Sequence, residues 1–194
     1  MLRKLLLRWG AALLWAAASL PAPANAELAS AFVSPEGRFA AVFPAEPMHE
    51  RSGRDTWAGR VEEGSFDLTR DGLRLRVEYH DVPRMAVAIL PPSLVLDLAK
   101  QGVLDDMGAS GASAEPISLH GHPGLALRYV PAAYPGVTEE TRLFLVGSRL
   151  YVAFARAEQP GTAEQAVARF LASFDAWESG GTVASVAGGS SGGM

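Results

Sequence analysis

Residues 143–154, LFLVGSRLYVAF, contain two apolar runs that are separated by Gly147-Ser148. A Gly-Ser pair between two such runs is typical of a two-residue β-hairpin turn. Both runs are apolar at consecutive positions, so both faces of the predicted strands must be buried against other elements. We therefore predict a hairpin at the centre of a sheet that is covered by helices.

A second predicted hairpin occupies residues 66–80, where apolar and polar residues alternate on both sides of Asp71-Gly72. Asp-Gly supplies the two positive-φ positions of a tight hairpin turn. Side chains of a strand point alternately to its two faces, so this pattern predicts one buried and one wet face. It indicates an antiparallel sheet that is open to solvent on one side at this point.

Two further hairpins are predicted around Pro35-Glu36-Gly37-Arg38 and Gly121-His122-Pro123-Gly124, which are rich in turn residues. The strands that flank these turns are, in chain order, residues 31–34 and 39–44, then 117–119 and 125–130. The polar residues 48–55 and the small residues 109–114 are expected to be loops.

Two helices are predicted from apolar residues at helical spacing. The first follows Pro91-Pro92-Ser93 and ends at Gly108, and the second begins at Thr162, an N-cap whose capping box Gln165 completes. Their apolar stripes are Leu96, Ala99, Val103, Leu104 and Met107 for the first, and Val167, Phe170, Leu171 and Phe174 for the second. The order of elements predicts an α+β fold with a central antiparallel sheet flanked by helices.

Residues 1–26 have the three parts of a secretory signal peptide. A basic start, an apolar run and small residues follow one another as Arg3, Lys4 and Arg8, then 9–20, then Ala24-Asn25-Ala26. The apolar run is too short to cross a bilayer, which takes about 20 residues. We expect cleavage between Ala26 and Glu27 rather than a retained anchor, and a periplasmic or secreted mature protein. That protein is one domain over residues 27–178 with a disordered Gly- and Ser-rich tail at 179–194.

The composition excludes several classes of function. Removal of residues 1–26 leaves 14 Lys and Arg against 21 Asp and Glu, a formal net charge of −7. The basic residues are scattered, so nucleic acid and anionic lipid are not expected as partners, and no stable membrane insertion is expected after cleavage. The absence of cysteine excludes disulfides, thiolate metal sites, thiol nucleophiles and a lipidated N-terminal cysteine.

Five segments of turn and core residues follow one another in the predicted domain. They are 34–44 (SPEGRFAAVFP), 79–83 (YHDVP), 121–124 (GHPG), 147–151 (GSRLY) and 169–174 (RFLASF). In this order they resemble the PsbP-like superfamily, particularly its short exported bacterial members of unknown function. The resemblance implies an antiparallel sheet between helices. Photosystem-associated members shield or assemble a membrane complex without catalysis, and Ran-binding import factors share the fold, but the resemblance implies no site residue here.

Two histidine motifs are candidates for chemistry. His120 and His122 flank Gly121, and a His-x-His pair could offer two imidazoles to a metal ion. Because both lie at a predicted tight turn without an adjacent carboxylate, we interpret them as solvated turn residues. His80 and Asp81 are adjacent on a predicted strand and point to opposite faces, which disfavours a catalytic pair.

Three acidic pairs could bind a hard cation, namely Glu62-Glu63, Asp105-Asp106 and Glu139-Glu140. None has the spacing of a calcium loop, so solvated charge is the expected role. The sequence lacks a nucleophile elbow, a phosphate-binding loop and a His-Glu-x-x-His motif. We therefore predict no catalytic residue, no metal site and no cofactor.

Three hypotheses for the function remain. The leading one is an exported non-catalytic protein that binds, or helps to assemble, another protein or an envelope complex. The alternative is a periplasmic carrier of a small apolar ligand, which requires a deep apolar pocket of about 300 Å³ or more. The third is a hydrolase, which requires a cleft that brings His80 or His120 close to a serine or a carboxylate.

Overall fold

Ten strands and three helices form the part of the chain that this computed structural model describes, residues 31–56, 59–159 and 161–180. The predicted signal peptide, its cleavage site between Ala26 and Glu27, and residues 181–194 of the predicted tail lie outside these residues. Within the described ranges, none of the helices combines the length and the apolar character that crossing a membrane requires.

The elements follow one another as five strands, two helices, four strands, a helix and a short last strand. Their bounds are β1 (Phe32–Ser34), β2 (Phe39–Ala41), β3 (Met48–Thr56), β4 (Gly59–Arg70), β5 (Leu73–Asp81), α1 (Arg84–Ile89), α2 (Pro92–Asp106), β6 (Ser110–Leu119), β7 (His122–Val130), β8 (Glu139–Val146), β9 (Arg149–Ala157), α3 (Thr162–Ser173) and β10 (Asp175–Ala176).

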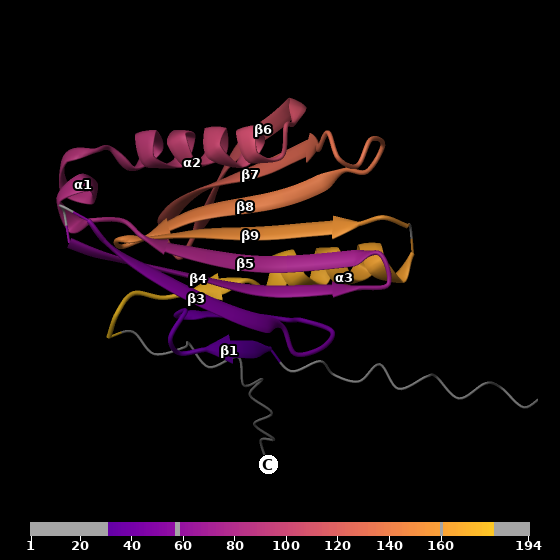
Figure 1. The fold of residues 1–194 in the computed structure, drawn as a ribbon, viewed down its shortest axis with the longest axis horizontal. Coiled ribbons are helices and arrows are strands. Elements are labelled where there is room, and N and C mark those ends of the chain that lie inside the picture. The colour runs from indigo at the N-terminus through magenta and orange to yellow at the C-terminus, as the bar shows by residue number, and fades with distance from the viewer. Residues whose placement is uncertain (1–30, 57–58, 160, 181–194) are drawn as a thin grey trace, which may run out of the picture.

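Seven strands form one antiparallel sheet in the order β3-β4-β5-β9-β8-β7-β6 (Figure 1). The β8–β9 hairpin lies inside this sheet, with β5 and β7 as its neighbours. Gly147 in its turn has a φ of 59°, which a glycine adopts without strain. The hairpin predicted from residues 143–154 is therefore confirmed, and β8 and β9 are buried at most positions.

The predicted hairpin at 66–80 is also confirmed. Asp71 and Gly72 both have positive φ, 49° and 72°, and the apolar residues of β5 alternate with partly exposed ones. The β6–β7 turn consists of His120 and Gly121, again with positive φ at both residues. His122 therefore begins β7, whereas the sequence placed it inside the turn.

Two predicted loops are strands in the structure. Residues 48–55 belong to β3 and residues 110–114 to β6, and these two strands are the edges of the large sheet. An edge strand is paired on one side only, and polar side chains there discourage pairing with other chains. Because most described residues of both segments are exposed, no alternation of apolar and polar residues revealed them.

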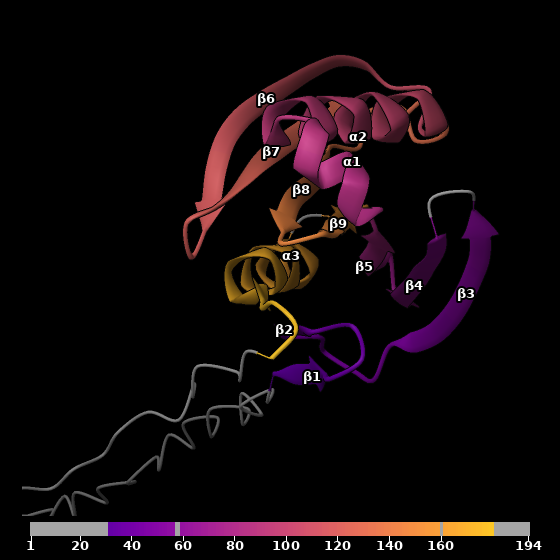
Figure 2. The ribbon, with the colours of Figure 1, turned by 90° about the vertical axis from the view of Figure 1, so that its left-hand side faces the viewer.

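The two faces of the large sheet are covered differently (Figures 1 and 2). Helix α3 packs against β9, β5 and β2, and the small sheet β1-β2-β10 lies beside it on the same face. Helix α2 packs against β7 and β8 on the opposite face, where alternate polar residues of β5 stay partly exposed. The predicted α+β fold with a large antiparallel sheet is confirmed. Helices flank it only in part, because they are few and share one face with the small sheet.

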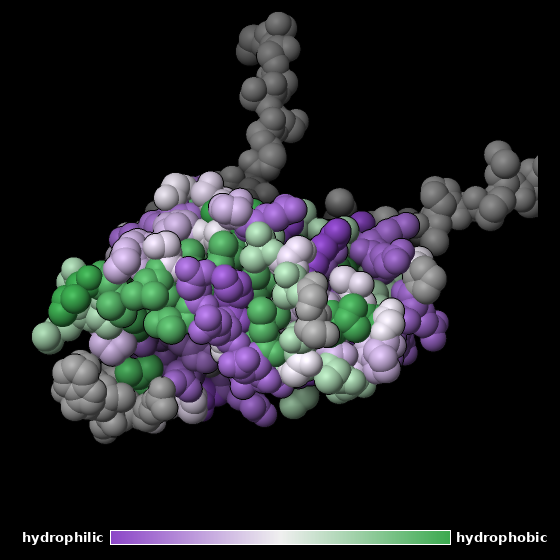
Figure 3. Space-filling model, turned by 90° about the horizontal axis from the view of Figure 1, so that it is seen from above, coloured by the Kyte–Doolittle hydropathy of each residue, from purple (hydrophilic) through white to green (hydrophobic). Residues whose placement is uncertain are grey.

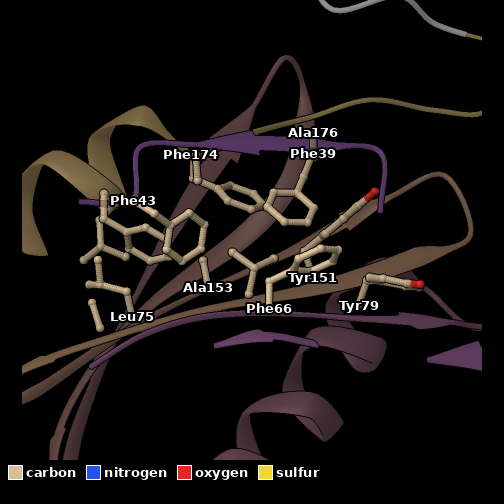
Figure 4. Close-up of a cluster of buried hydrophobic side chains, with 14 of the residues drawn as sticks. Phe39, Phe43, Phe66, Leu75, Tyr79, Tyr151, Ala153, Phe174 and Ala176 are labelled. Carbon is tan, nitrogen blue, oxygen red and sulfur yellow. The ribbon is translucent and has the colours of Figure 1, made fainter. Parts of the chain in front are cut away.

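The larger core fills the space between the sheet and the layer of α3 with β1-β2-β10 (Figure 4). Phe39 packs on Phe66 and Phe174 with ring centroids 4.9 and 6.1 Å apart. Phe170 and Phe174, both predicted as core residues of the last helix, are 0% and 5% exposed. A second, smaller core lies beneath α2, centred on Leu96.

The start of α3 differs from the prediction by one residue. The N-cap is Gly161, with a φ of 111°, and Thr162 is the first helical residue. The Gly161 N–H donates to Oε2 of Glu164 at 3.4 Å, so Glu164 takes the part predicted for Gln165. The chain then continues beyond the helix into β10, which the sequence did not predict.

Adding a methyl group at Gly64 of β4 tests how closely this strand packs against the aromatic side chain of Tyr79 in β5. The Gly64→Ala variant is expected to lose about 1–3 kcal/mol of unfolding free energy, because its Cβ would overlap the buried ring of Tyr79. Gly102→Ala in α2 is the matched control, since it faces open space and should gain about 1 kcal/mol. Urea denaturation of both variants measures the difference, and equal effects would contradict the packing described here.

Candidate functional site

Segments far apart in the sequence meet at one end of the large sheet, around α1 (Figure 2). The N–H of Val82 donates to the carbonyl of Ser148 at 2.8 Å, which joins the end of β5 to the β8–β9 turn. The N–H of Trp177 donates to the carbonyl of Arg38 at 3.1 Å, which joins the C-terminal residues to the β1–β2 turn. We call this region, with α1 itself, the α1 end.

Arg149 joins three segments of the α1 end. Its Nε and Nη2 donate to the two carboxylate oxygens of Asp81 at 2.6 and 2.9 Å. Its Nη1 donates to the carbonyls of Glu36 and Gly37 at 2.9 and 3.2 Å, and its Cζ lies 4.2 Å from the ring centroid of Tyr79. Burial opposes the charged form, but the hydrogen bond and charge of Asp81 raise the pKa of Arg149 above its ordinary value.

Tyr151, two residues after Arg149 in β9, holds the same turn. Its hydroxyl lies 2.9 Å from the carbonyl of Gly37 and 3.1 Å from that of Arg38, to which it donates. Burial raises the pKa of Tyr151 to about 12, because the phenolate would lose its hydration. The β1–β2 turn is thus fixed to the sheet by two buried donors of β9.

A groove of about 380 Å³ opens at the α1 end. One wall is α1, with Arg84, Val87 and Ala88, and the opposite side is formed by the β8–β9 turn and by Glu178. Arg38 also lines the groove, and its guanidinium contacts Oγ of Ser179 at 2.9 Å and Asp81 at 3.4 Å. Asp81 therefore serves two arginines, of which Arg149 is the closer.

Large apolar side chains are exposed beside this groove. Met85 and Ile89 of α1 are 62% and 74% exposed, and Leu94 and Leu98 of α2 are 42% and 55% exposed. Figure 3 shows apolar residues gathered over the end of the molecule that carries α1 and the adjoining part of α2. We call Met85, Ile89, Leu94 and Leu98 the helix surface.

The candidate metal ligands His120 and His122 are held by separate carboxylates. Nε2 of His120 lies 2.7 Å from Oδ1 of Asp175, and Nε2 of His122 lies 4.0 Å from Oε1 of Glu178. Within the described residues, no group of three or more His, Cys, Asp or Glu side chains could hold a metal ion. The geometry therefore ties the β6–β7 turn to the C-terminal segment.

His80 lies in a polar concavity of about 250 Å³ on the open face of β3, β4 and β5. Its Nε2 lies 3.3 Å from Oε2 of Glu78, two residues earlier on the same face. This hydrogen bond lowers the pKa of Glu78, against the effect of its burial, and the charge of Arg76 lowers it further. Ser52 and Ser65 line the concavity, but within the described residues no hydrogen bond joins either hydroxyl to the imidazole. The arrangement lacks an activated nucleophile.

One member of the acidic pairs contradicts the prediction of solvated charge. Glu139 is 0% exposed, and its Oε1 accepts a hydrogen bond from Nη1 of Arg156 at 2.8 Å. The ring of Tyr134 lies 3.6 Å from the Arg156 guanidinium. Glu139 lies at the start of β8, opposite Arg156 of β9, so the register places the two charges together beneath a loop. Asp105 and Asp106 are exposed as predicted.

Sequence reasoning missed the Arg149–Asp81 pair and the helix surface. Two features of the sequence could have indicated them. Arg149 is the only charged residue within the apolar segment 143–154, and a charged residue in a buried hairpin needs a partner. The apolar residues 85–89 lie between Pro83 and Pro91, too few to form a core element by themselves.

Arg149→Lys tests whether the forked geometry, and not charge alone, holds the α1 end. Lysine keeps the charge but cannot bridge both oxygens of Asp81, so we expect a loss of about 2 kcal/mol of unfolding free energy. Arg128→Lys is the control, because Arg128 is 67% exposed and its pair with Glu140 contributes about 0.5 kcal/mol or less. Similar losses in urea denaturation would show that the fork is not needed.

The Tyr151→Phe variant tests whether the phenol is buried, through the dependence of the unfolding free energy on alkaline pH. The folded-state pKa of about 12 lies above the ordinary value of 10.0. The contribution of the Tyr151 hydroxyl to the unfolding free energy is therefore fully present below pH 10 and is lost as the pH rises toward 12. Phenylalanine does not titrate, so the variant should show a shallower fall over this window. Some fall remains, because burial also raises the pKa of Tyr129 to about 12. Urea denaturation at several pH values measures the slope, and an unchanged slope would contradict the assignment.

No protein-family model matches the sequence, and no curated protein matches it. Among solved structures, the chain is similar to the solution structure of cyanobacterial PsbP (CyanoP) from Synechocystis sp. PCC 6803. The TM-score is 0.50 at 13% sequence identity, and the alignment covers 81% of this chain and 99% of that chain. The similarity shows that the described chain has a PsbP-like fold.

Proposed function

We propose that this protein is an exported, non-catalytic docking protein that binds another protein of the cell envelope through the helix surface. The signal-peptide pattern of residues 1–26 supports export. A fold alone does not determine function, so the proposal rests on a specific surface.

The observation that carries the proposal is the exposure of α1. This six-residue helix, RMAVAI, contains five apolar residues after Arg84, and none of its residues is buried. Apolar side chains contribute to stability only when they leave water, so α1 gains little from its own fold. Contiguous apolar residues exposed beside polar ones mark a protein interaction site.

Charge favours a protein partner over a lipid surface. The exposed side of α2 carries Asp105 and Asp106, Asp97 is paired there with Lys100 at 2.7 Å, and the chain without residues 1–26 has a formal net charge of −7. An anionic membrane would repel a protein of this net charge. A symmetric contact between two copies would place the aspartates of both copies in one interface, which disfavours self-association.

The size of the helix surface suits a small contact. Full burial of a Leu, Ile or Met side chain is worth about 1.5–3 kcal/mol. The four side chains are about half exposed, so covering them contributes on the order of 4 kcal/mol. Association itself has a cost of at least similar size, so polar contacts at the rim must add to the affinity.

The cavities do not favour the alternative of an apolar carrier. The space between the sheet and α3 is filled by aromatic side chains such as Phe39, Phe66 and Phe174. A cavity of about 480 Å³ lies at the N-terminal end of α3, where Val137, Ala155, Ala157 and Val167 share the lining with Glu140, Glu158 and Glu164. A carrier of an apolar ligand requires a mostly apolar lining.

Ile89→Lys combined with Met85→Lys tests the docking role. A photo-crosslinker at Leu94 of the full-length protein should capture one stoichiometric partner in the envelope of its own cell. The double variant should lose that capture, because two cations replace the most exposed apolar side chains of the helix surface. The control carries Lys at Ala172 and Ala168, which are exposed on α3, and should capture as the parent does. Equal capture by the parent and the double variant would refute the proposal.

A further inference from the structure

We infer that the groove of the α1 end receives a carboxylate of the docking partner, on a segment whose apolar residues cover Met85 and Ile89. This inference rests on the proposed function and specifies the chemistry of the partner. It follows from an unpaired cation, from the charges of the groove and from the geometry of α1.

Arg84 is a cation without a partner among the described residues. It is exposed, and neither an ion pair nor a side-chain hydrogen bond involves it there. It is also the first residue of α1, where the helix dipole disfavours positive charge, and the first turn holds no acidic residue. The local structure thus offers Arg84 no counter-charge, which leaves its guanidinium available for a contact outside the fold.

The groove has an excess of positive charge in an acidic protein. Arg149 pairs through both donors with the carboxylate of Asp81, so these two charges balance, while Arg38 and Arg84 line the groove. Glu178 is the acidic residue that lines the groove, 59% exposed and 4.0 Å from His122. Two guanidinium groups line the groove against one carboxylate, which leaves one positive charge to be balanced. A single carboxylate satisfies this balance, whereas a doubly charged phosphate would exceed it.

The geometry of α1 joins the charge to the apolar surface. Residues one helical turn apart lie on the same side, so Arg84, Val87 and Ala88 face the groove. Met85 and Ile89 follow Arg84 and Ala88 directly in the chain, so they lie on the adjacent, exposed side of the same helix. A partner segment that covers these two residues thus brings a neighbouring Asp, Glu or C-terminal carboxylate within reach of Arg84.

A library of random peptides displayed on phage tests the inference with the full-length protein as the target. We expect selected peptides to share an acidic residue, or a free C-terminal carboxylate, next to two or more apolar residues. Their binding should weaken about tenfold or more in Arg84→Glu, because a charge-assisted contact becomes a repulsion. Arg169→Glu is the matched control. Arg169 is exposed on α3 and makes no ion pair within the described residues, so reversal of its charge should leave peptide affinity unchanged.

Protein stability separates lost binding from unfolding. Arg84→Glu places a negative charge in the first turn of α1, which the helix dipole favours, so its urea midpoint should be equal to the parent's or higher. A lower midpoint together with weaker binding would contradict the argument.

The outcomes distinguish the inference from the function on which it rests. Peptides that require Ile89 but bind Arg84→Glu as tightly as the parent would overturn the carboxylate inference and leave the docking surface in place. A selection that yields no peptide dependent on Ile89 would overturn the proposed docking surface as well.

Discussion

The forked contact between Arg149 and Asp81 is the constraint on which the arrangement of the α1 end depends. A guanidinium that is only 5% exposed needs a counter-charge and hydrogen-bond acceptors, and Asp81 with the carbonyls of Glu36 and Gly37 supplies both. These partners come from the end of β5 and from the β1–β2 turn. Satisfying one buried cation therefore fixes the small sheet against the large one. Because α1 begins three residues after Asp81, the same contact sets where the helix surface leaves the sheet.

The two faces of the sheet have different physical roles. The face under α3 and the small sheet is closed by aromatic packing, apart from the cavity at the N-terminal end of α3. The other face is only half covered by α2, and polar side chains fill the rest. Exposed apolar side chains are thus concentrated on α1 and α2, which lie outside the main core. A rigid sheet that presents short helical segments at its rim is suited to recognition by contact.

Regular patterns in the sequence predicted the well-buried parts of the fold. The consecutive apolar residues 143–154 indicated the inner hairpin, and alternation at 66–80 indicated β4 and β5, because burial imposes a period on the side chains. The edge strands β3 and β6 lack that period, so they resembled loops. The same reasoning assigned Glu139 to solvent, although cross-strand register places it opposite Arg156 in the interior.

The sequence by itself determined the α+β class, the inner hairpins, the core stripe of the last helix and the pattern of an export signal. Those features depend on residues close together in the chain, where turn chemistry and periodicity are visible. Only the tertiary structure decided which charges are paired, since Arg149 meets Asp81 across 68 positions and His120 meets Asp175 across 55. It also decided that α1 is uncovered, because exposure depends on which elements pack together, and a short apolar segment has the same sequence whether it is buried or bare.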